Sequence, residues 1–186
     1  MSRTPSLLIA LSLAASPAPL LAAEAHVHGQ ANLGVAIDGD TLTLMLESPT
    51  DSLVGFEHAP GSDLERAAVA RMKETLEQAD KLFLPTAAAE CRLASVELHS
   101  LLLDGEDGSE PAHEAGHEDD EHEGHEGHAD LDGDFTFRCA HPEQLHDLEV
   151  RLFDAFPRLK KVKVAVVAPQ GQKAADLTAT GNRIGW

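Results

Sequence analysis

The stretch from Asp104 to Asp134 limits what this chain can fold into, because it cannot form a core of its own. It holds fourteen Asp or Glu residues, no Lys or Arg, and a single large apolar side chain, Leu131. A segment of this composition buries too little apolar surface to offset the entropy that is lost on ordering. The sequence therefore predicts a long disordered loop, rich in His, Asp and Glu, over residues 104–134.

Most of the charge of the chain lies in this loop. The formal net charge is −18, and the loop carries −14 of it, which leaves −4 for the rest. Such an acidic chain is repelled by phosphates, so nucleic acid is not an expected partner. A loop that serves only solubility has no need of imidazole, whereas imidazole and carboxylate together bind zinc and similar metals. We therefore expect Zn²⁺ at the five loop histidines, His113, His117, His122, His125 and His128.

Residues 113–117 spell H-E-A-G-H, which matches the zinc-protease signature H-E-x-x-H. That signature works only on a stable buried helix, which holds both histidines on one face and aims the glutamate at a metal-bound water. Here Gly116, Gly124 and Gly127 follow Pro111, and no apolar stripe is present to dock a helix. The protease interpretation is therefore rejected.

The N-terminus has the pattern of a secretory signal peptide. Arg3 supplies a positive region, residues 7–15 are apolar, and small residues allow cleavage after Ala23 or after Ala25. The apolar run is too short to span a bilayer core of about 30 Å. We expect residues 1–23 to be a signal peptide, and residues 24–186 to be a single metal-binding domain that is exported to the periplasm and does not span the membrane.

Two cysteines in an exported chain are expected to pair. Cys91 and Cys139 flank the acidic loop, each at the outer end of a predicted strand. If those strands form one antiparallel hairpin with the loop at its tip, the cysteines meet at its base as a disulfide. The alternative is thiolate ligation of zinc, which the lack of C-x-x-C spacing makes the weaker case.

Alternating apolar residues predict a hairpin over residues 26–46, with its turn at Asp38-Gly39-Asp40. Ser62 and Glu65 form a capping box at the start of a helix that ends at Pro85. We expect further strands over residues 92–103, 135–139, 161–167 and 174–180, and a second helix from Pro142 to Phe156 with Leu145, Leu148 and Leu152 inward. These elements predict an α+β fold, in which an antiparallel β-sheet built from hairpins carries two α-helices on one face.

Four histidines outside the loop are candidate metal ligands. His26 and His28 are two residues apart, so in a strand both imidazoles project from one face, with the Cα atoms about 6 to 7 Å apart. Two histidines do not complete a tetrahedral zinc site, and the sequence leaves the remaining ligands open. The candidates, all at predicted polar positions, are His58 with Glu57 and His99 with Glu97.

Several of these motifs occur together in a known family. They are the H-V-H-G string at residues 26–29, Ser48-Pro49 followed by G-F-E-H-A-P at residues 55–60, the His-rich loop between two cysteines, and Phe156-Pro157 downstream of Cys139. In these motifs the chain resembles the ZrgA family, periplasmic proteins of Gram-negative bacteria that are associated with zinc uptake. The resemblance implies zinc binding in support of an inner-membrane zinc transporter. It assigns no individual ligand.

Three functions compete on these grounds. The first is a periplasmic zinc-binding protein that supports zinc acquisition by an importer, and the second is a copper or nickel scavenger or metal buffer that protects against excess. Affinity does not separate these two, because imidazole sites favour copper over zinc in vitro. The third, a metal-dependent hydrolase, needs an open coordination position and a base, and the sequence shows no nucleophile constellation or phosphate loop, so we expect no enzymatic activity. We also expect that removal of residues 106–132 leaves a folded protein that still binds at least one metal ion more tightly than the loop does.

Overall fold

The structure is a computed structural model that describes residues 27–104 and 129–186. The expected signal peptide, His26 and the five loop histidines lie outside the described residues. The strands are β1 (Gln30–Asp38), β2 (Thr41–Pro49), β3 (Phe83–Pro85), β4 (Cys91–His99), β5 (Asp130–Cys139), β6 (Asp147–Val150), β7 (Lys161–Ala168), β8 (Gly171–Leu177) and β9 (Arg183–Gly185). The helices are α1 (Thr50–Val54), α2 (Asp63–Glu77), α3 (Ala79–Leu82), α4 (Leu101–Asp104) and α5 (Leu152–Ala155), with 3₁₀ turns at Ala87–Ala89 and Pro142–Gln144.

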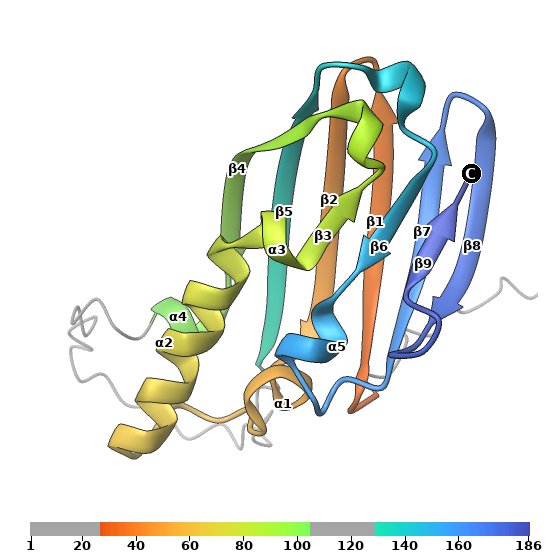
Figure 1. The fold of residues 1–186 in the computed structure, drawn as a ribbon. Coiled ribbons are helices and arrows are strands. Elements are labelled where there is room, and N and C mark those ends of the chain that lie inside the picture. The colour runs from red at the N-terminus through yellow and green to blue at the C-terminus, as the bar shows by residue number, and fades with distance from the viewer. Residues whose placement is uncertain (1–26, 105–128) are drawn as a thin grey trace, which may run out of the picture.

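Six strands form the main sheet in the order β4-β5-β2-β1-β7-β8, shown in Figure 1. All neighbouring pairs are antiparallel except β1 and β7, which run parallel. The expected first hairpin is confirmed, and Gly39 supplies the positive φ of 58° that its tight turn requires. The expected closing hairpin of β7 and β8 is confirmed as well.

Alternation of apolar and polar residues gives this sheet one buried face. Along β1 and β2, for example, Leu33, Val35, Leu42 and Leu44 are each at most 1 % exposed, and the residues between them face away from the core. Each fully buried side chain of this size stabilises the fold by about 1.5–3 kcal/mol relative to exposure. The buried face therefore fixes the register of the strands that bury alternate residues on it, namely β1, β2, β5 and β7.

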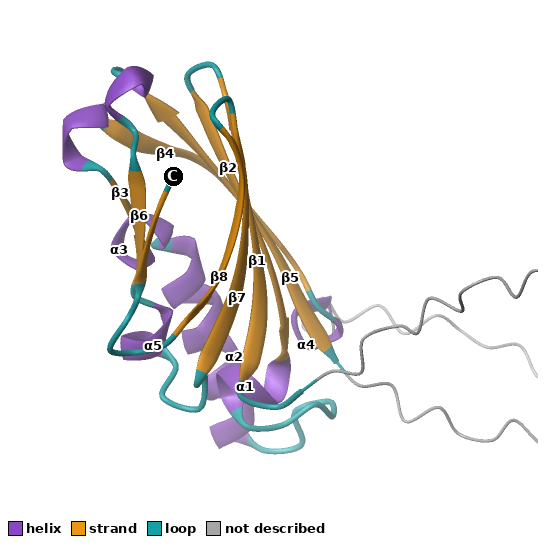
Figure 2. Cartoon of the chain, turned by 90° about the vertical axis from the view of Figure 1, so that its right-hand side faces the viewer, coloured by secondary structure: helices purple, strands orange, loops and turns teal. Residues whose placement is uncertain are grey.

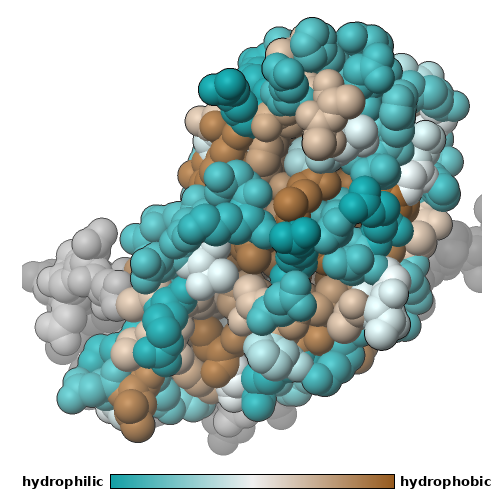
Figure 3. Space-filling view, in the orientation of Figure 1, coloured by the Kyte–Doolittle hydropathy of each residue, from teal (hydrophilic) through white to brown (hydrophobic). Residues whose placement is uncertain are grey.

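A second layer covers only that buried face (Figure 2). It consists of α2, α3 and α5 together with a three-stranded sheet in the order β3-β6-β9. The rings of Phe83 in β3 and Phe135 in β5 meet across the two layers, with their centroids 5.0 Å apart. Figure 3 shows the outside of this layer, which is mostly hydrophilic with small apolar patches. The fold thus has antiparallel-rich sheets and helices, as the α+β expectation requires.

The expectation of two covering helices is wrong for the end of the first helix and for the whole of the second. The first helix ends at Glu77 instead of Pro85, and Phe83–Pro85 form β3. The capping box of the first helix is confirmed, because Glu65 N donates to Ser62 Oγ and the Glu65 side chain accepts from Ser62 N. The segment from Pro142 to Phe156, however, contains a 3₁₀ turn, strand β6 and the short helix α5. Leu148 and Val150 alternate with Asp147 and Glu149, so a strand buries its apolar residues between β3 and β9 without a helix.

The expected boundaries of the acidic loop also change. Residues 130–134 belong to β5, where Leu131 is fully buried, and Ala129 just before it is 1 % exposed. The segment before the loop ends in α4 rather than in a strand that continues to residue 103. The expected disulfide is confirmed, since Cys91 pairs with Cys139 at the far end of the β4–β5 hairpin. None of the helices in the described part of the chain is both long and apolar enough to cross a membrane.

Candidate metal-binding site

One end of the main sheet gathers the polar motifs that the sequence singled out. At this end β1 begins, β2 runs into α1, β4 runs into α4, and β5 begins. The register places Pro49 opposite Asp130 and His99 opposite Asp132, so both borders of the acidic loop lie here beside α1. The disulfide lies at the other end of the same strands. We call these the loop end and the disulfide end.

The H-V-H-G and G-F-E-H-A-P motifs meet at the loop end. His28 Nε2 lies 3.0 Å from Glu57 Oε1, although the two residues are far apart in the sequence. The His28 side chain is 60 % exposed, whereas that of Glu57 is only 14 % exposed. The structure thus presents an accessible imidazole next to a largely buried carboxylate, which is a donor pair that suits zinc.

Hydrogen bonds hold the chain around His28 in place. β1 begins only at Gln30, and His28 lies in a turn that Gly29 completes with a φ of 78°. The expectation that His28 lies in a strand is therefore wrong, because β1 starts after it, and His26 lies outside the described residues. Gly29 N donates to Ser52 Oγ at 2.9 Å, and Gly29 O accepts from Lys160 N at 2.7 Å. These bonds fasten the His28 turn to α1 on one side and to the start of β7 on the other.

A second carboxylate, Asp51, lies on the other side of the His28 ring. Its Oδ1 is 3.8 Å from His28 Nδ1, and its Oδ2 is 3.4 Å from the Nη2 atom of Arg158. Arg158 Nε also donates to the Asp51 backbone oxygen at 3.2 Å. The His28 ring therefore lies between Glu57 and Asp51, and the Arg158 guanidinium contacts Asp51.

His58 is turned away from this pair. Its ring stacks on Phe56 with centroids 5.1 Å apart, and Nδ1 lies 3.0 Å from the backbone oxygen of Ala59. A carbonyl oxygen only accepts, so Nδ1 is the donor of this bond. Glu65 Oε1 is 3.9 Å from Nε2 of the same ring. The backbone N–H of Gly61, which donates to Glu65, holds the pKa of this carboxyl below its usual value.

His99 lies apart from the other described histidines. It is exposed on the open face of β4, and β5 and β2 separate it from β1, a distance of about 14 Å at normal strand spacing. The register continues from His99 through Asp132, Glu47, Asn32 and Lys163 to Asp176. The structure therefore does not bring His99 and Glu97 to the His28–Glu57 pair.

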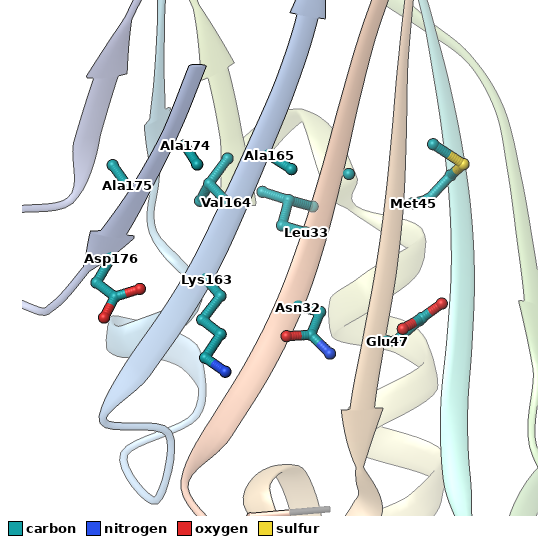
Figure 4. A pocket seen from close by; sticks show the side chains of 11 residues that line it. Asn32, Leu33, Met45, Glu47, Lys163, Val164, Ala165, Ala174, Ala175 and Asp176 are labelled. Atoms are coloured by element: carbon teal, nitrogen blue, oxygen red, sulfur yellow. The ribbon is translucent and has the colours of Figure 1, made fainter. Parts of the chain in front are cut away.

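The same open face carries a shallow hollow of about 600 Å³, shown in Figure 4. Its floor is made of small residues such as Gly34, Ala165 and Ala174, and Glu47, Lys163 and Asp176 lie near one border. No histidine or cysteine is among the residues that line it. The hollow therefore does not offer the nitrogen and sulfur ligands that zinc prefers.

Within residues 27–104 and 129–186, no group of three or more His, Cys, Asp or Glu side chains is arranged so that it could hold a metal ion. The His28–Glu57 pair supplies two donors, and a complete zinc site needs more. Sequence reasoning named both members of this pair but missed Asp51 and Arg158. The signal available in the sequence was Gly55, because a glycine directly before the F-E-H string indicates a special turn there. The structure has such a turn, with a φ of 96° at Gly55.

Comparison with known proteins agrees with this combination of motifs. No curated protein matches the chain at a significant level. The family model described as "ZrgA family zinc uptake protein" matches residues 25–186, which includes every element of both sheets. Because this match spans most of the chain, the protein belongs to the ZrgA family of zinc uptake proteins.

Proposed function

We propose that the protein is a periplasmic zinc-binding protein that supports zinc acquisition by an inner-membrane importer, and that His28 and Glu57 bind the zinc it carries. One observation carries this proposal, namely that two motifs far apart in the sequence place an imidazole nitrogen 3.0 Å from a carboxylate oxygen. Membership of a zinc uptake family names the metal. The role is one of binding and transfer, without catalysis.

The distance between the two donors suits a shared zinc ion. Zinc binds histidine nitrogen and carboxylate oxygen at about 2.0–2.2 Å, which in a tetrahedral site sets the two donors about 3.3 Å apart. His28 Nε2 and Glu57 Oε1 need to separate by only a few tenths of an ångström to reach that spacing. For a third ligand we propose His26, on grounds of sequence alone.

The proposal gives the other candidate histidines different roles. His58 and His99 each stand apart from the pair, so neither is needed for this site. The loop histidines, from His113 to His128, remain predicted zinc ligands from the sequence, and export by a signal peptide remains a prediction on the same basis. Copper or nickel protection is kept as an outcome of the test rather than as a second proposal.

Competition between the protein and a chromophoric zinc chelator tests the site. The double variant H28A/E57Q is expected to lose the tightest-bound zinc, because both donors are altered, and to keep weaker zinc binding elsewhere. His141→Ala is the matched control, since His141 is 52 % exposed and follows Cys139 at the disulfide end. Equal zinc affinity of the double variant and the wild type would overturn the assignment.

Growth of a bacterial strain that lacks the protein tests the physiological half. The proposal expects poor growth in zinc-depleted medium, rescued by the wild-type protein and by H141A but not by H28A/E57Q. Normal growth under zinc depletion combined with sensitivity to excess copper or nickel would replace zinc acquisition with metal protection.

A further inference from the structure

We propose that Asp51 is a positioning residue, which orients the His28 ring through Nδ1 while zinc binds at Nε2, and that Arg158 holds Asp51 in this role. This inference rests on the proposed zinc site and adds a division of labour between its two carboxylates. Glu57 is then the ligand, and Asp51 is the outer partner of the histidine.

The geometry of the imidazole ring requires such a division. Glu57 Oε1 approaches Nε2, whereas Asp51 Oδ1 approaches Nδ1. The two ring nitrogens point in different directions, so one metal ion bound to a ring nitrogen contacts only the carboxylate on that side. A metal-bound histidine usually donates its other N–H to a carboxylate, which fixes both its tautomer and its orientation.

Three observations place zinc on the Glu57 side. The Nε2–Oε1 distance of 3.0 Å is close to the tetrahedral spacing, whereas the Nδ1–Oδ1 distance is 3.8 Å. Asp51 Oδ2 faces the Arg158 guanidinium at 3.4 Å, and an arginine that is always charged repels a divalent cation at that carboxylate. The Glu57 side chain is also the more buried of the two, at 14 % exposed against 22 % for Asp51.

The Arg158 guanidinium packs closely against a glycine, which leaves room for it. A Cβ atom at Gly55 would lie only 3.1 Å from the guanidinium Cζ and Nε atoms, and the φ of 96° at Gly55 also disfavours other residues. Gly55 N donates to Asp51 O, which also accepts from Arg158 Nε. The Arg158 side chain is 57 % exposed, and a pair this exposed contributes little stability. The contribution of the Arg158–Asp51 pair is therefore to hold the Asp51 carboxylate in position beside His28.

Nuclear magnetic resonance of the protein with ¹⁵N-labelled histidine tests the inference at the ring itself. Zinc is expected to shift the Nε2 resonance of His28 and to leave a proton on Nδ1, and ¹¹³Cd in place of zinc is expected to show scalar coupling to Nε2. Asp51→Ala is expected to weaken zinc binding at His28 by about 10–100-fold. Asp51→Asn is expected to restore most of the affinity, because the amide oxygen can also accept from Nδ1 once the ring moves within hydrogen-bond distance of it, closer than the present 3.8 Å.

Asp176→Ala is the matched control, since this aspartate pairs with Lys161 at 3.2 Å on the surface of β8. The control is expected to leave the His28 resonances and zinc affinity unchanged. Coupling to Nδ1, or an Asp51→Asn variant that binds as weakly as Glu57→Gln, would make Asp51 a ligand and overturn the inference while the zinc site stands. Zinc that leaves all His28 resonances unchanged would overturn the zinc site as well.

Discussion

The two ends of the main sheet are held by different interactions. At the disulfide end, Cys91 and Cys139 are covalently joined, and Cys139 is 5 % exposed. At the loop end, hydrogen bonds of buried polar groups join the segments instead of a covalent bond. The four buried polar side chains of the described residues all lie there, at Ser48, Thr50, Ser52 and Ser100.

Thr50 shows what these buried polar groups do. Its side chain is fully buried, and its Oγ1 lies 2.8 Å from both Phe56 O and Ala129 O. Thr50 N also donates to Ala129 O at 3.0 Å. One residue therefore joins the loop that carries Glu57 to the border of the acidic segment. A satisfied buried polar network specifies positions that apolar packing alone does not fix. A disulfide that stabilises the fold therefore lies at one end of these strands, and a hydrogen-bond network that positions the residues of the site lies at the other end.

The largest expected effect is on folding, and it depends on the C-terminal boundary of a deletion in the acidic segment. Replacing residues 105–128 with a short Gly-Ser linker should leave a folded protein, because β5 and its anchor at Ala129 remain. Replacing residues 105–132 should unfold it, since Leu131 is fully buried and removal of such a side chain alone costs about 2–5 kcal/mol. Thermal denaturation followed by circular dichroism measures both. This corrects the expectation that residues 106–132 are dispensable, and a cooperative transition in the longer deletion would refute the correction.

Removing the disulfide should cost stability at the other end without changing the site. The double variant C91A/C139A is expected to lose about 2–4 kcal/mol of unfolding free energy, because the two cysteines are 48 positions apart and the unfolded chain gains freedom. Alanine is chosen because Cys139 is buried. Urea denaturation measures the loss, and chelator competition at a temperature where the variant is folded should give unchanged zinc affinity. A parallel loss of zinc affinity would show that the two ends are not independent.

Local patterns in the sequence predicted the elements whose partners lie nearby. The first hairpin, the capping box of α2 and the β7–β8 hairpin each depend on residues within one turn or one loop. The disulfide was predictable because the expected export and a single pair of cysteines leave few options. The prediction failed around β6, because the spacing of Leu145, Leu148 and Leu152 also fits a helix, although only Leu148 lies in the strand. Strand pairing with Phe83 and Ile184 decides the outcome there, and these partners are remote in the sequence.

The candidate site was also predictable only in part. His28 and Glu57 stood out because their types suit zinc and their motifs are distinctive. Asp51 and Arg158 did not, because 107 residues separate them and neither type signals a metal on its own. His99 was grouped with His28 and Glu57 by residue type, whereas the strand order places it at the edge of the sheet. Side-chain chemistry therefore indicated the ligands, and only the topology sorted them into groups.

A moderate effect is expected from Thr50, where the network at the loop end can be broken at one atom. Thr50→Val keeps the shape but removes the hydroxyl, so the expected loss of unfolding free energy is about 1–3 kcal/mol. Zinc affinity at His28 should fall too, because Phe56 O and Ala129 O lose their shared donor. Thr43→Val, on the open face of β2, is the control, and it should stay within about 0.5 kcal/mol of wild type. Equal effects of the two substitutions would remove the special role of Thr50.

The smallest expected effect concerns the start of α2, where Glu65 caps the helix that follows His58. Glu65 Oε2 accepts from Gly61 N at 2.8 Å and from Ser62 N at 3.0 Å. The bond from Gly61 is the main reason that the pKa of Glu65 lies below its usual 4.5 in the folded protein. A carboxyl with a lowered folded pKa stabilises the fold above its unfolded pKa, and this stabilisation is lost as the pH falls through the folded pKa. Glu65→Gln should therefore lower Tm slightly at pH 7, and the difference from wild type should shrink as the pH falls below 4.5.

The matched control for this variant is Glu74→Gln, at an exposed position farther along α2. Both substitutions remove one negative charge from the same helix, so a general charge effect would change both profiles of Tm against pH in the same way. Only the Glu65 variant removes a carboxylate that accepts backbone N–H groups at the first turn, where the helix dipole also favours negative charge. Identical profiles for the two variants would show that hydrogen bonding by Glu65 adds nothing to the order of the loop end.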